Sequence, residues 1–230
     1  MLKPEFVVSM GSVLYQKYAV NSDFIIGFAD VLKRRIAAVG QNTAIVTGGG
    51  YPAKELIRFF KSIGITDTDM LDSIAIAVTR NNARVLTQSL NKLDVSAEHV
   101  KTLPDSFPPD VHVMVTGGKE IRQSSDAVAA QWAINLRVPM VFNIGAPFVY
   151  HYLPNGITPD TSRPIFEMTG KEYLNLVGPD HIPGEKVPAG RAAIKIADPA
   201  GIIFQQLGPS LKNIENGFKG KKVIGTRIHP

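Results

Sequence analysis

Short apolar runs alternate with longer amphipathic stretches along most of this chain. The short runs are rich in β-branched residues and have the length of a buried strand, so they favour a sheet. The longer stretches repeat apolar residues every three or four positions, as helices with one buried face do. We expect strands at residues 6–10, 43–47, 111–115, 139–143, 202–205 and 223–228. We expect helices at residues 23–39, 51–63, 70–90, 126–136, 169–177, 191–197 and 211–218.

Strands and helices that alternate in this way are typical of the α/β class. We therefore predict a three-layer α/β/α sandwich around a central, mainly parallel sheet, formed by residues 1–230 as a single domain. Two segments rich in proline and glycine, 145–163 and 179–190, are predicted to be loops. Ser22 or Asp23 is expected to cap the first long helix, because both residue types favour that position.

The composition restricts the class of protein and its partners. The 230 residues are 44% hydrophobic and 20% charged, which is enough for one large globular domain. No apolar stretch approaches the ~20 residues of a membrane span, and residues 1–5 lack a signal-peptide pattern, so we expect a cytoplasmic protein without a membrane partner. The net charge of +5 comes without a basic helix that carries interleaved aromatic residues, so no nucleic-acid partner is expected.

The chain has no cysteine, which excludes disulfides, thiolate catalysis and cysteine-based metal sites. Its five histidines are scattered and include no pair four residues apart. The sequence therefore predicts no dedicated metal site.

Two glycine-rich turns each join an apolar run to a helical pattern. The first is TAIVTGGG at 43–50, and the second is VMVTGG at 113–118, which precedes SSDAVAA at 124–130. Glycines between a strand and a helix leave backbone N–H groups available at the positive end of the helix dipole, where a phosphate or another oxyanion binds well. The two turns therefore predict a ligand that carries phosphate, such as a nucleotide.

Five motifs follow one another along the chain: GSVL at 11–14, GGG with AK at 48–54, DSIAIAVTRNNA at 72–83, GG through QSSDAVAA at 117–130, and GTRI at 225–228. In this order they resemble the motifs of the amino-acid kinase superfamily, and most of all those of its archaeal-type UMP kinases. The fourth motif is similar to the family's G-G-T-x-P-G-H-T-T-D-A-V-A-A. The resemblance covers nearly the whole chain and implies ATP-dependent phosphoryl transfer to a nucleoside monophosphate, most of all UMP to UDP, with ATP and Mg²⁺ as cofactors.

The same resemblance implies roles for segments and for individual residues. Residues 1–144 would form a lobe that binds the acceptor nucleotide, and residues 145–230 a lobe that binds the nucleotide donor. Catalytic roles would fall to Asp126 and Lys195, and metal ligation to no residue. Acceptor contacts are expected from Gly48, Gly49, Gly50, Lys54, Asp72, Thr79, Asn82, Gly118, Ser124 and Ser125. Contacts with the phosphates and the donor are expected from Gly11, Ser12, Asn143, Gly145, Tyr150 and Arg191. Relatives pair through the helix that corresponds to 72–90, so the resemblance implies a homo-oligomer, a dimer or a hexamer.

The sequence departs from the family's pattern mainly on the donor side. The loop after the first strand has one glycine, Gly11, where the family has two, and it lacks a lysine. NIGAPFVY at 143–150 replaces N-x-T-N-V-D-G-V-Y, and PAGRAAIK at 188–195 replaces D-P-x-A-A-K, with Gly190 in place of its aspartate. These substitutions remove carboxylates and leave cations, so they make the pocket more electropositive.

Two other functions therefore stay open. One is a non-catalytic or repurposed family member that binds a nucleotide or an inorganic oxyanion as a storage, scaffold or regulatory subunit, as the molybdenum storage proteins do. The other is a phosphotransferase whose acceptor is another small phosphate or a carboxylate. Single residues also have structural alternatives: the glycine triplet could be only a tight turn, Asp126 only a helix N-cap, and Trp132 only part of the core.

Overall fold

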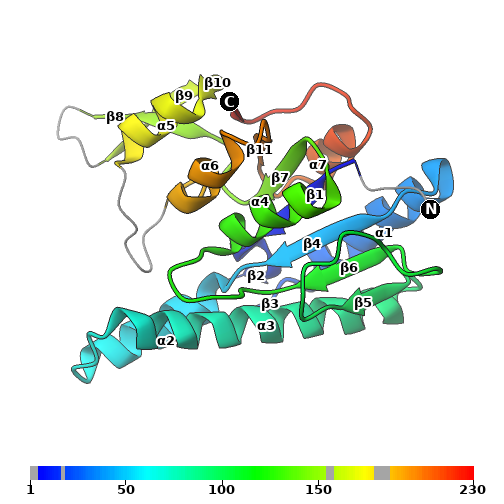
Figure 1. Cartoon of the computed structure of the whole chain (residues 1–230), viewed down its shortest axis with the longest axis horizontal. Coiled ribbons are helices and arrows are strands. Elements are labelled where there is room, and N and C mark those ends of the chain that lie inside the picture. Colours follow the sequence, from blue (N-terminus) through cyan, green and yellow to red (C-terminus); the bar gives the residue numbers. More distant parts are fainter. Residues whose placement is uncertain (1–4, 17–18, 154–157, 179–186) are drawn as a thin grey trace.

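The structure, a computed structural model, describes residues 5–16, 19–153, 158–178 and 187–230. A central eight-stranded sheet runs through the molecule in the strand order β10-β12-β11-β7-β1-β4-β6-β5 (Figure 1). Neighbouring strands are parallel except for β11 and β12, so the prediction of a mainly parallel sheet is confirmed. The strands are β1 (Val7–Met10), β4 (Thr43–Thr47), β5 (Ala97–His99), β6 (Val113–Thr116), β7 (Met140–Ile144), β10 (Glu167–Thr169), β11 (Ile203–Leu207) and β12 (Arg227–His229).

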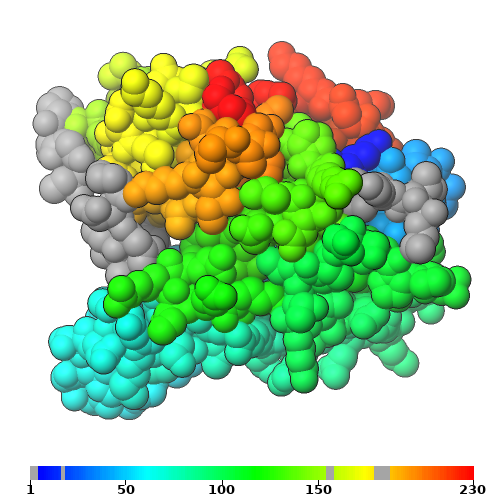
Figure 2. Space-filling view, viewed as in Figure 1, coloured from blue at the N-terminus to red at the C-terminus, as the bar shows by residue number. Residues whose placement is uncertain are grey.

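Helices cover both faces of this sheet, which confirms the three-layer sandwich. One face carries α1 (Ser22–Val39), α3 (Thr68–Lys92) and α7 (Leu211–Phe218). The other face carries α4 (Ser125–Leu136), α5 (Gly170–Val177) and α6 (Arg191–Ala197). The helix α2 (Gly50–Ser62) continues from β4 and contacts α3. Figure 2 shows α2 (cyan) at one corner of the molecule, apart from α5 and α6 (yellow and orange).

Successive residues of the central strands enter opposite halves of the core. In β1, Val7 packs in the cluster that contains α4 and α6, whereas Val8 packs in the cluster that contains α1 and α7. This alternation is the two-residue period of a strand buried on both faces. Trp132 of α4 is fully buried and its indole N–H donates to the Pro104 carbonyl (2.9 Å), so its interpretation as a core residue is confirmed.

The prediction that residues 145–163 form a loop is wrong. Two strands, β8 (Val149–Tyr152) and β9 (Pro159–Ile165), pair there as an antiparallel hairpin outside the main sheet. Prolines and glycines masked the alternating pattern of β8, and β9 tolerates its own prolines because a two-stranded ribbon has free edges. Residues 154–157 and 179–186 of the two predicted loops lie outside the described residues. Two further strands, β2 (Tyr15–Gln16) and β3 (Ala19–Val20), form a second small ribbon after the short 3₁₀ helix Ser12–Leu14.

Two boundaries also differ from the prediction. The last strand is limited to Arg227–His229, because the Asn213 side chain bonds both the N–H (2.8 Å) and the carbonyl (2.7 Å) of Ile224. The cap of α1 is Asn21 rather than Ser22 or Asp23: its Oδ1 accepts the Phe24 N–H while its Nδ2 donates to the Val13 carbonyl. None of the helices in the described ranges combines the length and the hydropathy that crossing a bilayer requires.

Candidate functional site

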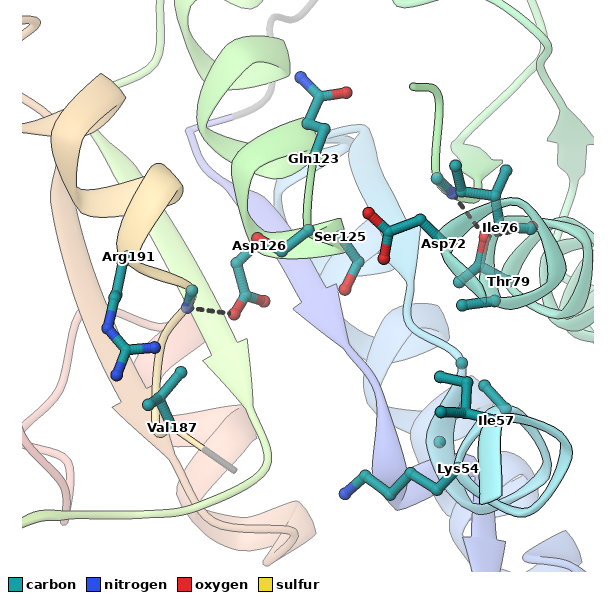
Figure 3. Close-up of a pocket in the computed structure, with 17 residues that line it drawn as sticks. Lys54, Ile57, Asp72, Ile76, Thr79, Gln123, Ser125, Asp126, Val187 and Arg191 are labelled. Atoms are coloured by element: carbon teal, nitrogen blue, oxygen red, sulfur yellow. Dashed lines mark hydrogen bonds between the residues drawn. The ribbon is translucent and has the colours of Figure 1, made fainter. Parts of the chain in front are cut away.

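Two adjoining pockets open beyond the carboxyl ends of the central strands, the edge of an α/β sheet where ligands bind. The first pocket, of about 250 Å³, lies between α2, α3 and the start of α4 (Figure 3). The second pocket, of about 680 Å³, lies between the ends of β1 and β7 and the β8–β9 hairpin. Both pockets are lined by Gly49, Gly50, Lys54, Ser125, Asp126 and Val187.

Asp126 lies at the junction of the two pockets in the first turn of α4. One carboxylate oxygen accepts the hydroxyl of Ser9 (2.6 Å), and the other accepts the backbone N–H of Gly190 (2.8 Å). Burial raises the pKa of Asp126, and these two hydrogen bonds oppose that shift. The alternative that Asp126 is the N-cap of α4 is wrong, because the Ser124 side chain accepts the Ala127 N–H and caps the helix.

Gly190 approaches the start of α4 so closely that a side chain there would collide with the Ser124 hydroxyl that caps the helix. A Cβ atom at this position would lie 2.3 Å from the Ser124 hydroxyl oxygen and 3.1 Å from its Cβ. The absence of a side chain therefore brings the Gly190 N–H within hydrogen-bonding distance of Asp126. The position at which the family has an aspartate has become a contact between α6 and α4.

The glycine triplet, one of the two turns predicted to hold phosphate, packs against the loop after β1. A Cβ on Gly48 would lie 2.9 Å from the Cα of Gly11, so the loops after β4 and β1 are in direct contact. Asn82 of α3 holds this turn in place, because its side-chain amide donates to the Gly48 carbonyl (2.8 Å). Asn82 is 2% exposed and is not among the residues that line the first or the second pocket, and its amide supports the turn.

The second glycine turn rests on α3 through Thr79. The Thr79 hydroxyl donates to the Ile76 carbonyl (2.7 Å) and accepts the buried Gly118 N–H (2.7 Å). A Cβ on Gly117 would lie 2.6 Å from the Arg80 nitrogen, so this turn also requires glycine. Thr79 and Gly118, both predicted as acceptor contacts, line the first pocket.

Replacement of Thr79 by valine is expected to lower the free energy of unfolding by about 1–3 kcal/mol, because the buried Gly118 N–H loses its acceptor. Thr87→Val is the matched control. Thr87 lies on the same helix with the same exposed fraction, 7%, and its hydroxyl bonds only the Ala83 carbonyl within the helix. Urea unfolding of both variants tests the prediction, and equal losses would contradict it.

Asp72 lines the first pocket from α3, and a neighbouring loop holds it in place. Its carboxylate accepts the Arg122 backbone N–H (2.8 Å), while the Arg122 side chain pairs with Asp69 (3.0 Å). Arg122 adopts a positive φ of 63° at the position where the family motif has glycine. Sequence reasoning missed Arg122, although that exchanged glycine could have indicated it.

The basic residues predicted for the site lie in different surroundings. Lys54 extends from α2 between the two pockets (Figure 3). Arg191 lines the first pocket, yet its buried side chain donates to the carbonyls of Val177 (3.1 Å) and Gly178 (2.7 Å) at the end of α5. Lys195 is exposed on α6 and is not among the residues that line the first or the second pocket.

The second pocket brings together all the remaining residues predicted for the donor. Gly11, Ser12, Asn143, Gly145 and Tyr150 line it. Sequence reasoning missed its aromatic wall, which is formed by Phe148 and Tyr152 with Tyr150 and comes from the hairpin that had been predicted as loop. Within the described ranges, no group of three or more acidic or histidine side chains is placed to hold a metal ion.

Comparisons with known proteins agree on one relationship. No protein-family model matches the chain. The chain is 30% identical over 226 residues to the uridylate kinase of Methanococcus vannielii, and the alignment covers 93% of this chain and 96% of that protein. The crystal structure of uridylate kinase from Archaeoglobus fulgidus matches with a TM-score of 0.72 at 25% identity, covering 97% of this chain and 99% of the other. The UMP kinase of Bacillus anthracis matches with a TM-score of 0.76 at 16% identity, covering 100% and 97%, which supports the fold alone.

Proposed function

This chain belongs to the uridylate kinase family, and we propose that it transfers the terminal phosphoryl group of ATP to UMP. The membership confirms the resemblance that the motifs indicated. The observation that carries the proposal is the shared wall of the two pockets, formed by the glycine turn, Lys54, Ser125 and Asp126. An acceptor in one pocket and a donor in the other would present their phosphates to each other at this wall.

We assign the acceptor UMP to the first pocket. The Asp72 carboxylate can accept hydrogen bonds from ribose hydroxyls, and its contact with the Arg122 N–H fixes its orientation. The UMP phosphate would lie at the shared wall, near Gly49 and Gly50 and the start of α4. The N-terminus of α4 directs its dipole toward negative charge there, which favours the phosphate.

Transfer requires positioned phosphates and stabilised negative charge more than covalent chemistry from the protein. An oxygen of the UMP phosphate forms the new bond to phosphorus while the bond from phosphorus to the ADP oxygen breaks. We assign charge stabilisation to Lys54, because it lines both pockets, whereas Lys195 lines neither. Through its two hydrogen bonds, Asp126 ties Ser9 of β1 and the Gly190 backbone to the start of α4, so it would position the wall at which the phosphates meet.

The second pocket fits ATP in size and in lining. Its volume of about 680 Å³ is within the usual range for small-molecule sites. Aromatic side chains of the hairpin and glycines of the loops both line it. Mg²⁺ bound to the ATP phosphates would supply charge neutralisation, and Mg²⁺ commonly keeps water and phosphate oxygens as most of its ligands. This fits a site where Asp126 is the one carboxylate among the residues that line the second pocket.

In this proposal, consecutive parts of the chain bind the acceptor and the donor. Residues up to 144 supply the first pocket with most of its lining, and the hairpin after residue 145 supplies the outer wall of the second. Arg191 would support the site by holding the end of α5 near Gly190. A homo-oligomer that pairs through α3 and a cytoplasmic location stay predictions. The relatives from Methanococcus vannielii and Archaeoglobus fulgidus are both named uridylate kinases, and neither supports a storage or scaffold role.

A coupled assay for UDP and ADP formation tests the proposed function. Purified protein with ATP, Mg²⁺ and UMP is expected to form UDP and ADP in equal amounts, and AMP in place of UMP is expected to give a lower rate. Asp126→Asn protein purified in parallel controls for a contaminating kinase. Absence of UMP-dependent ADP formation, with UMP binding retained, would contradict the proposal.

Lys54→Met is expected to lower kcat/KM for UMP by about 100- to 1,000-fold, because it removes a positive charge from the wall that the two phosphates share. Methionine keeps most of the length of the lysine stem, so the packing of α2 is preserved. Lys61→Met, on the same helix and exposed, is the matched control and is expected to retain wild-type kinetics. Equal effects of both substitutions would exclude a specific role for Lys54.

A further inference from the structure

Five basic side chains gather where α3 passes the ends of β5 and β6, and none of them lines the first or the second pocket. This cationic cluster consists of Arg80 and Arg84 of α3, His99 at the end of β5, Lys101, and Lys119 after β6. We propose that the cationic cluster is a binding site for a small anion that carries two or more phosphate groups.

Hydrogen bonds anchor two members of the cluster, Lys119 and Arg80, to the groups around them. The Lys119 ammonium donates to the Lys101 carbonyl (2.6 Å) and to the Thr116 hydroxyl (2.5 Å). The Arg80 guanidinium donates to the carbonyls of Gly118 (3.0 Å) and Lys119 (2.9 Å). Lys119 is thus anchored half-buried by neutral oxygens, and its charge has no anionic partner in these contacts.

The electrostatic environment of the cluster is positive throughout. Burial and the charge of Arg80 lower the pKa of Lys119 to about 8. Burial also lowers the pKa of His99, together with the charges of Arg84, Lys119 and Lys101. The charged groups that shift these two pKa values are therefore all cations.

The members of the cluster lack the carboxylate partners that several other arginines of the chain have. Arg34, Arg58 and Arg122 each form an ion pair with a carboxylate. Within the described ranges, none of the five members of the cluster forms such a pair. A group of like charges that lacks compensation destabilises itself, and a bound anion would relieve that repulsion.

The arrangement favours several phosphates over one. The five basic side chains come from three separate segments, and their combined positive charge matches an anion with several phosphate groups better than a single phosphate. Arginine and lysine are also the side chains that best recognise phosphate oxygens. The source could be a free inorganic polyphosphate or the phosphate tail of a nucleotide.

Isothermal titration of inorganic tripolyphosphate into the full chain at low salt tests this inference, and it requires no phosphoryl transfer. The Arg84→Gln/Lys101→Gln variant is expected to bind at least tenfold more weakly than the wild type. The matched control is Lys92→Gln/Lys212→Gln, which removes two exposed lysines elsewhere and is expected to bind like the wild type. Absence of binding by the wild type would overturn the proposal, as would equal binding by the cluster variant.

The Lys54→Met variant separates the cluster from the two pockets. Retained binding of tripolyphosphate by this variant supports the cluster, whereas loss of binding would place the anion in the pockets and overturn the proposal. Titration of UTP into the same variant then identifies the source. A loss of UTP affinity on addition of Arg84→Gln/Lys101→Gln that exceeds the loss for tripolyphosphate indicates a nucleotide at the cluster, and an equal loss indicates recognition of the phosphates alone; no loss for either anion would overturn the proposal.

Discussion

Asparagine in place of Asp126 is expected to lower kcat for UDP formation by about 100- to 1,000-fold while the fold stays intact. The amide can still accept the Gly190 N–H and can donate to the Ser9 hydroxyl, so the local hydrogen bonds survive. It no longer provides the carboxylate charge at the wall that the two pockets share. Steady-state kinetics with UMP and ATP measure the effect, and a loss below about threefold would remove Asp126 from the proposed mechanism.

Although Asp126→Asn lowers activity, we expect it to raise stability relative to the wild type at neutral pH. Because the pKa of Asp126 is raised in the folded state, this residue stabilises the fold below its unfolded pKa, and that contribution is lost as pH rises through the folded pKa. Asparagine does not titrate. The stability of Asp126→Asn relative to the wild type is therefore expected to increase from pH 4 to pH 7.5.

Urea unfolding of both proteins at the two pH values measures this difference. Ser9→Ala serves as a second variant, because it removes the hydroxyl that lowers the pKa of Asp126 and leaves the carboxylate in place. It is expected to make the fall in stability with rising pH steeper than in the wild type. A relative stability of Asp126→Asn that stays constant with pH would show that the carboxylate is not destabilised by burial.

The main sheet was predictable because its strands follow one simple rule. Runs such as 43–47 are largely apolar, end at glycines and are followed by helices. The residues of each such segment therefore indicate by themselves that it is a buried strand of a parallel sheet. Most of the first pocket was predictable for the same reason, since all of its lining except Val187, Gly190 and Arg191 follows β4 or β6 or lies on α2 and α3 between them. Sequence neighbours of these strands reach the same edge of a parallel sheet.

The second pocket was harder to predict because it depends on contacts between distant segments. The β8–β9 hairpin follows the weak alternation Val149–Tyr152, and its prolines gave the stronger signal for a loop. Ser9 is an ordinary strand residue in sequence, and only the arrangement of β1 beside α4 brings it to Asp126, 117 positions away. Asn82 was assigned to the pocket by its motif, whereas its amide is used by the glycine turn.

Gly190→Ala is expected to lower the free energy of unfolding by about 1–3 kcal/mol and to reduce kcat, although the family carries a side chain in this motif. The added Cβ would lie 2.3 Å from the Ser124 hydroxyl oxygen, so either Ser124 rotates and gives up its cap of α4, or α6 and α4 move apart and weaken the bond from the Gly190 N–H to Asp126. Gly145→Ala is the control for stability, because a Cβ there meets nothing within 4 Å. Urea unfolding measures the first effect and the coupled assay measures the second.

A double-mutant cycle shows whether the contact with Ser124 causes the loss. Ser124→Gly removes both atoms that the new Cβ would meet first, and glycine replaces a serine cap at a cost of only a few tenths of a kcal/mol. The double variant Gly190→Ala/Ser124→Gly is therefore expected to recover much of the stability lost by Gly190→Ala, with an interaction energy of about 0.5–3 kcal/mol. Additive losses would mean that the backbone at residue 190, rather than the contact between α6 and α4, requires glycine.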